Sequence, residues 1–164
     1  MIARAEIETQ SASETQAVGQ ALGEAAAPGD ILLLVGPFGA GKTTLVQGIA
    51  RGLGVEGPVT SPSFVIANEH QGRIPLYHVD LYRVEKMDAA TLEALAEYFG
   101  SDGICAVEWP DSLPSDLVEG ASRIELTVLD ENRRRLLIET SAERLLEAFD
   151  QRPVAQRSAS GDPA

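Results

Sequence analysis

Lysine is scarce in this chain, which has only two lysines among 164 residues; the other eleven basic side chains are arginines. Twenty-five acidic side chains outnumber them and give a net charge of −12. This balance counts against direct binding of nucleic acid, because lysine and arginine that neutralise phosphates supply most of the non-specific affinity. One basic cluster, Arg133–Arg135, is interpreted as a charged strand start after a hairpin turn; a contact for RNA or an acidic partner is the open alternative.

Cysteine and long apolar runs are equally rare. The single cysteine, Cys105, excludes a disulfide within the chain, and its apolar surroundings predict a small buried hydrophobic residue. No apolar run approaches the roughly 20 residues that a membrane-spanning helix needs. No basic and apolar leader is visible at the N-terminus. We therefore expect a cytoplasmic protein without a membrane segment.

Hydrophobic periodicity predicts alternating strands and helices in one domain over residues 1–150. The strands are expected at 2–8, 31–35, 63–69, 74–80, 103–110, 122–129 and 134–140, and the helices at 11–26, 42–53, 88–99 and 141–149. The last two strands alternate well enough for an antiparallel pair near one edge of the sheet. Residues 151–164 are polar and rich in turn-forming residues, so we expect a disordered tail.

One of the two lysines, Lys42, lies in the segment Gly36-Pro37-Phe38-Gly39-Ala40-Gly41-Lys42-Thr43, which fits the phosphate-binding pattern G-x-x-x-x-G-K-[ST]. An apolar strand precedes the pattern and an amphipathic helix follows it. Glycines let backbone N–H groups turn toward phosphate oxygens, and the helix N-terminus adds partial positive charge. A lysine on a flexible stem reaches the β- and γ-phosphates better than the bulkier fork of arginine. The threonine hydroxyl supplies a ligand for Mg²⁺.

These observations together predict an α/β fold, a P-loop NTPase-like three-layer sandwich with a largely parallel sheet and an antiparallel edge. Ligands of such sheets bind at the carboxyl ends of the strands. Two predicted strands end there in an acid, at Asp80 and Glu108. Either carboxylate could hold Mg²⁺, directly or through water, or position the attacking water.

Several neighbouring residues have two possible roles. His78 shares a strand face with Asp80, so it is either a structural histidine or part of the site. Arg83 either forms an ion pair or stabilises phosphate charge. The segment "TSPS" (60–63) is either an ordinary loop or a switch over the γ-phosphate. Trp109 directly follows Glu108 and should report on the site.

The chain resembles the TsaE family, the small bacterial P-loop ATPase of threonylcarbamoyladenosine synthesis. The resemblance covers about residues 11–110 and rests on "SASET", "GAGKTT", "TSPSF", "YHVDLYR" and "VEWP", in that order. It implies a single domain that binds ATP or ADP and hydrolyses ATP slowly. It also implies a complex with two other proteins that modify the tRNA adenosine next to the anticodon. An acidic protein would leave contact with the tRNA to those partners.

The resemblance also implies roles for individual residues. Lys42, Asp80 and Glu108 would be the catalytic residues; Thr43 and Glu108 would hold Mg²⁺, with Asp80 in the metal or water shell. Ala12 would border the adenine. The nucleotide-binding set would be Ala12, Gly36, Gly39, Ala40, Gly41, Lys42, Thr43, Thr44 and Trp109.

One position departs from the family. Its loop commonly reads "GDLGAGKTT", whereas this chain has Pro37-Phe38 in place of Asp-Leu. The contact of that aspartate is lost, and proline has no N–H to offer a phosphate. The later loop amides, Gly39 to Thr44, are unchanged, so we expect nucleotide binding to be retained with a different strength.

Two other functions are compatible with the motif. A small-molecule kinase usually needs several arginines over the phosphates, and the only such cluster here is Arg133–Arg135. A nucleotide-dependent assembly factor would need ATP binding without hydrolysis. Phosphate transfer to an added acceptor would identify the kinase. Partner function that survives the loss of hydrolysis would identify the assembly factor.

Overall fold

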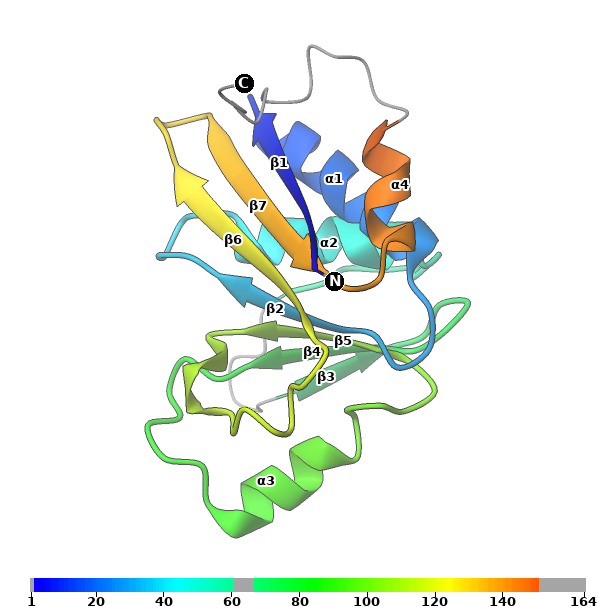
Figure 1. Cartoon of the computed structure of the whole chain (residues 1–164), viewed down its shortest axis with the longest axis vertical. Coiled ribbons are helices and arrows are strands. Elements are labelled where there is room, and N and C mark those ends of the chain that lie inside the picture. The colour runs from blue at the N-terminus through cyan, green and yellow to red at the C-terminus, as the bar shows by residue number, and fades with distance from the viewer. Residues whose placement is uncertain (1, 61–66, 151–164) are drawn as a thin grey trace.

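The computed structural model describes residues 2–60 and 67–150, which form a seven-stranded mixed sheet with helices on both faces (Figure 1). The strands run in the order β1-β7-β6-β2-β5-β4-β3. Their bounds are β1 Ala3–Thr9, β2 Ile31–Val35, β3 Ala67–His70, β4 Leu76–Asp80, β5 Ile104–Glu108, β6 Ser122–Val128 and β7 Arg134–Thr140. The helices are α1 Ala12–Ala25, α2 Lys42–Gly52, α3 Ala89–Ala96 and α4 Arg144–Asp150, with a 3₁₀ turn at Pro110–Ser112.

The centre of the sheet is parallel and both sides are antiparallel. Strand β2 pairs in parallel with β5 and β6, and β4 pairs in parallel with β5. The expected antiparallel pair β6–β7 is confirmed, and β1 extends it. A second antiparallel edge, β3 on β4, was not expected. The parallel centre aligns the carboxyl ends of the strands, so that Asp80 of β4 lies opposite Glu108 of β5.

Two apolar clusters, one on each face, give the three layers. Residues of β2 alternate between them: Leu32 and Leu34 join the larger cluster under α1, α2 and α4, whereas Leu33 faces the smaller one, which contains Leu95 of α3. The central strands β2 and β5 are therefore covered on both faces, which is why their sequences read as almost continuous apolar runs. Cys105 is fully buried in the smaller cluster, as predicted, and burial raises the pKa of its thiol to about 12.

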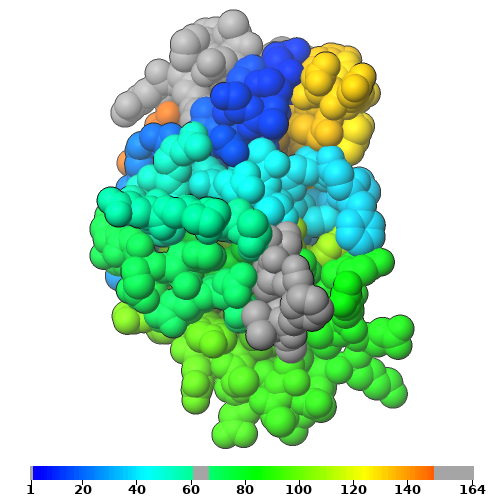
Figure 2. Space-filling view, turned by 180° about the vertical axis from the view of Figure 1, so that it is seen from behind, coloured from blue at the N-terminus to red at the C-terminus, as the bar shows by residue number. Residues whose placement is uncertain are grey.

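Helices α1 and α2 lie directly against each other, as the adjoining blue and cyan surfaces show (Figure 2). A Cβ added to Gly48 or Gly52 of α2 would stand 2.1 or 2.2 Å from a backbone oxygen of α1. Gly19 and Gly23 of α1 face the backbone of α2 in the same way. The glycines of α2 therefore serve close packing on a neighbouring helix and not on the sheet.

Local signals are largely confirmed. Ser11 caps α1 by accepting a hydrogen bond from the Glu14 N–H at 3.1 Å. The Glu14 carboxylate accepts from the Gln10 N–H and not from the Ser11 N–H, so the reciprocal bond of a capping box is not formed. Asp88 caps α3, but this helix ends at Ala96 and not at residue 99. In the described part of the chain, no helix is long and apolar enough to cross a membrane.

Three expectations fall, wholly or in part, on residues that the structure does not describe. The tail at 151–164 lies outside the described residues, and so do positions 61–63 of the "TSPS" segment. The start of the strand expected at 63–69 also lies there; the described strand β3 begins at Ala67.

Candidate functional site

The loop between β2 and α2 surrounds a cavity of about 270 Å³ at the carboxyl edge of the sheet. Gly41 is the N-cap of α2 and has a φ of 101°, a left-handed conformation that glycine adopts without the cost a side chain would impose. The first N–H groups of α2 therefore remain available at the cavity. The lining residues are Pro37, Phe38, Gly39, Ala40, Gly41, Lys42, Thr43, Thr44, Asp80, Glu108 and Trp109.

Lys42 is 5% exposed, and its ammonium group is held by the loop itself. It donates to the backbone oxygens of Gly36 and Pro37 and lies 3.8 Å from the ring centroid of Trp109. Burial lowers the pKa of Lys42, while the charges of Glu108 and Asp80 act in the opposite direction. An anion in the cavity would offer this buried cation stronger partners than two neutral carbonyls.

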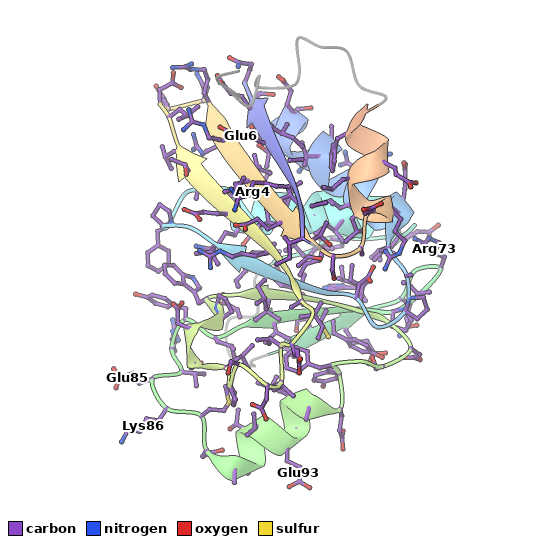
Figure 3. All side chains as sticks on the ribbon, viewed as in Figure 1. Arg4, Glu6, Arg73, Glu85, Lys86 and Glu93 are labelled. Atoms are coloured by element: carbon purple, nitrogen blue, oxygen red, sulfur yellow. The ribbon has the colours of Figure 1, made fainter. Side chains whose placement is uncertain are left out.

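The other lysine has no such environment. Lys86 is exposed, and its side chain extends into solvent from the loop before α3, beside Glu85 (Figure 3). The two lysines therefore differ completely in burial.

Glu108, at the end of β5, is 3% exposed and has two side-chain partners. The Thr43 hydroxyl lies 3.2 Å from each of its carboxylate oxygens. Nε2 of His78 lies 2.6 Å from Oε2. These contacts join α2, β4 and β5 at one point, and they place His78 directly behind a carboxylate that lines the cavity.

Asp80 is half-buried at the end of β4, and its Oδ1 accepts a bond from the Tyr82 N–H at 3.0 Å. Burial raises the pKa of Asp80, and repulsion from Glu108 adds to this effect. A cation between the two carboxylates would relieve that repulsion.

The donor set fits Mg²⁺. One hydroxyl and two carboxylates are hard oxygen ligands of the kind that this ion prefers. The described residues contain no group of three or more His, Cys, Asp or Glu side chains that could hold a metal alone. Such an incomplete set suits an ion that takes its remaining ligands from phosphates and water.

Two aromatic rings, Phe38 and Trp109, line the cavity, and the ring of Tyr82 packs against both. Phe38 lies 4.5 Å from Tyr82 and 5.0 Å from Trp109, measured between ring centroids, and Phe38 and Tyr82 are 66% and 52% exposed. Among the described residues, Trp109 is the one non-glycine residue with a positive φ, 56°. The indole lies over Lys42, and the use of Trp109 as a reporter of the site stays a prediction.

A second cavity of about 150 Å³ lies on the other side of the loop. Ala12 lines it, and Arg134 does so from the β6–β7 hairpin; the contact of Ala12 with adenine stays a prediction. One guanidinium nitrogen of Arg134 donates to the Gly39 oxygen at 3.0 Å, which ties the hairpin to the loop. The full lining is Ala12, Thr15, Gly39, Gly41, Thr44, Glu131, Asn132 and Arg134.

Two of the three arginines in the basic cluster form ion pairs within the fold. Arg133 pairs with Asp130 and Glu8, and Arg135 pairs with Glu6. The bonds from Arg133 and from nearby backbone N–H groups lower the pKa of Asp130 to about 2. This geometry agrees with the charged strand start after a hairpin turn. No ion pair involving Arg83 occurs among residues 2–60 and 67–150.

The fold brings most of the predicted site residues together at the first cavity. Gly36 contributes its carbonyl to Lys42, and Ala12 lies at the second cavity instead. Sequence reasoning missed Phe38, Tyr82 and Arg134. Their only signals were the departure from the family at Phe38 and the position of Tyr82 two residues after Asp80; Arg134 had no local signal of contact with the loop.

Comparison with known proteins agrees with the family resemblance. A family model described as "Threonylcarbamoyl adenosine biosynthesis protein TsaE" matches residues 9–136. The tRNA threonylcarbamoyladenosine biosynthesis protein TsaE of Bacillus subtilis is 39% identical over 129 residues, which cover 78% of this chain and 80% of that protein. The protein of the same name from Synechocystis is 49% identical over 100 residues, 58% of this chain and 64% of its own length. The match therefore spans less than two thirds of the cyanobacterial relative.

A solved structure shares the fold. The crystal structure of Bacillus subtilis YdiB superposes with a TM-score of 0.72 at 32% identity, covering 92% of this chain and 94% of that one. Since the family model matches far more than half of the chain and the fold agrees over nearly all of it, the chain belongs to the TsaE family.

Proposed function

We propose that this chain binds ATP with Mg²⁺ and hydrolyses it, as a component of the system that forms threonylcarbamoyladenosine in tRNA. The observation that carries the proposal is the buried Lys42, which faces Thr43, Glu108 and Asp80 around one cavity. Its relatives in the family are named for threonylcarbamoyladenosine biosynthesis. The two protein partners and the indirect contact with tRNA are part of the proposal.

Each side chain has a role that follows from its position. Lys42 would exchange its loop carbonyls for the β- and γ-phosphates, and the amides from Gly39 to Thr44 would surround them. The second cavity, beside Ala12, would receive the nucleoside. Trp109 would cover the phosphates from the other side.

The metal would be held by Thr43 and Glu108, because these two groups already meet at 3.2 Å. When bound, Mg²⁺ supplies positive charge that stabilises the transferring phosphoryl group. Asp80, whose raised pKa follows from its burial, is placed to orient the attacking water and to accept its proton. The lysine and the loop amides bind the charge that develops on the phosphate oxygens.

The test is ATP hydrolysis by the purified chain, alone and with the two partner proteins and tRNA. We expect a low rate that rises in the complex. Lys42→Met should abolish ATP binding, whereas Lys86→Met, the same change at the exposed lysine, should have no effect. A chain that neither binds nor hydrolyses ATP in any mixture would refute the proposal.

Glu108→Gln separates hydrolysis from binding. We expect it to retain ATP and to lose both hydrolysis and the activity of the partners. If the partners remained active, binding alone would suffice, and the chain would be an assembly factor. If the γ-phosphate of the unmodified protein appeared on an added acceptor, the chain would be a kinase.

A further inference from the structure

His78 is a buried polar residue that the roles proposed above do not explain. It lies in the middle of β4 and has 0% exposure. Its Nε2 lies 2.6 Å from Oε2 of Glu108. Its Nδ1 is also buried and has no hydrogen-bond partner in the described part of the chain.

The chemistry of the pair determines where the proton lies. An ionised carboxylate only accepts hydrogen bonds, so against an ionised Glu108 the Nε2 of His78 is the donor. The single described polar contact of this imidazole is therefore with the carboxylate. Both nitrogens of a buried imidazole normally have hydrogen-bond partners. Here the ring position gives Nε2 its contact with Glu108 and leaves Nδ1 without a partner among the described residues.

That bond fixes the plane of the Glu108 carboxylate. The last torsion of a glutamate is broad and roughly two-fold, so the group can rotate unless its neighbours hold it. His78 binds Oε2 from the sheet side, and the Thr43 hydroxyl contacts both oxygens from α2. Among the described residues, removal of the imidazole would leave the Glu108 carboxylate with only the weaker, bifurcated contact of the Thr43 hydroxyl.

We propose that His78 is a positioning residue that holds the Glu108 carboxylate in the orientation needed to bind Mg²⁺ beside Thr43. This inference rests on the proposed function, because it assigns a role within the same site. Groups that orient metal ligands typically change metal affinity by 10–100-fold when they are removed. His78 would not touch the nucleotide, so its loss should leave binding of metal-free ATP unchanged.

Two replacements of similar volume test whether the hydrogen-bond donor of His78 is needed. The side-chain amide of His78→Gln reaches about as far as Nε2 and can still donate, whereas His78→Met fills similar space without a donor. ATP binding is measured by calorimetry in EDTA, and the Mg²⁺ concentration at half-saturation is then measured at fixed ATP. We expect that concentration to rise about 10–100-fold in His78→Met and to stay within about threefold of the unmodified protein in His78→Gln. Metal-free ATP affinity should be equal in all three proteins.

Other outcomes overturn the inference. If both variants bind Mg²⁺ like the unmodified protein, Glu108 needs no positioning. If both lose affinity equally, or if metal-free ATP binding falls as well, His78 acts only through packing. Should His78→Met fail to fold, His78→Asn, whose amide is too short to reach Oε2, takes its place with the same expectation. An unmodified protein that binds ATP without any response to Mg²⁺ would instead contradict the proposed function.

Discussion

Replacement of Gly48 by alanine should destabilise the protein, although alanine is the better helix former. Gly48 lies inside α2, where helix propensity alone would favour alanine by about 1 kcal/mol. The added Cβ, however, would stand 2.1 Å from the Gln16 backbone oxygen of α1. Because both atoms belong to the main chain or are fixed to it, no rotamer change can relieve the contact.

The size of the effect follows from the required movement. Ordinary contacts of a Cβ begin at 3.4 Å, so the two helices would have to separate locally by 3.4 − 2.1 = 1.3 Å. Overpacking of this kind costs about 3 kcal/mol at the upper end of its usual range. After subtraction of the propensity gain of about 1 kcal/mol, we expect a net loss of about 2 kcal/mol. The melting temperature of a domain of this size should fall by roughly 4–8 °C.

Urea unfolding measures the loss of stability, and ATP binding measures the effect of a shift of α2 on the site. Since α2 carries Lys42 and Thr43 at its start, a shift of the helix should also weaken ATP binding. Gly54→Ala is the control: it adds the same methyl group just after α2, where nothing lies within 4 Å and only the φ of 76° is unfavourable. The control should cost about 1 kcal/mol and leave ATP binding unchanged. If Gly48→Ala stabilised the protein, or left both quantities unchanged, the glycine packing of α1 on α2 would not be the reason for this residue.

Three further predictions concern other parts of the fold. Cys105, whose thiol pKa is about 12 and which is fully buried, should react with a thiol reagent at pH 8 at least about 1,000-fold more slowly in the native protein than in denaturant; equal rates would contradict its burial. Arg144→Met should lower the free energy of unfolding by about 2 kcal/mol, because Arg144 donates to both oxygens of Asp30 and to the Ala25 carbonyl, and the loss should be smaller when Asp30→Asn is already present. Trp109 fluorescence should change on addition of Mg-ATP, since the phosphates draw Lys42 from the indole face, and Lys42→Met should show no such change.

The local elements and the loop could be predicted because their signals lie within a few residues. The apolar run before Gly36 and the amphipathic pattern after Gly41 were sufficient to locate β2, α2 and the phosphate loop. The helix expected up to residue 99 was too long, because Phe99 packs into the smaller apolar cluster from the turn that follows α3 and so extends the apolar pattern beyond the helix.

The second antiparallel edge and the contact of Arg134 with Gly39 could not be predicted. Strand β3 pairs with β4 through a short hairpin, but only the sheet order shows that no strand lies beyond it among the described residues. Arg134 is 95 residues away from Gly39 along the chain. No periodicity within the hairpin indicates which loop its guanidinium will meet.

The sequence by itself determined the order of strands and helices, the phosphate loop with its lysine, and the two acids that end β4 and β5. These features depend on residue types at short spacings, and short-range sterics and hydrophobic periodicity decide them. Tertiary structure alone decided that Gly48 faces α1, that Trp109 covers Lys42, and that His78 contacts Glu108. These contacts join positions 30 or more residues apart, and they form only when the parallel centre of the sheet brings the ends of separate strands to one edge.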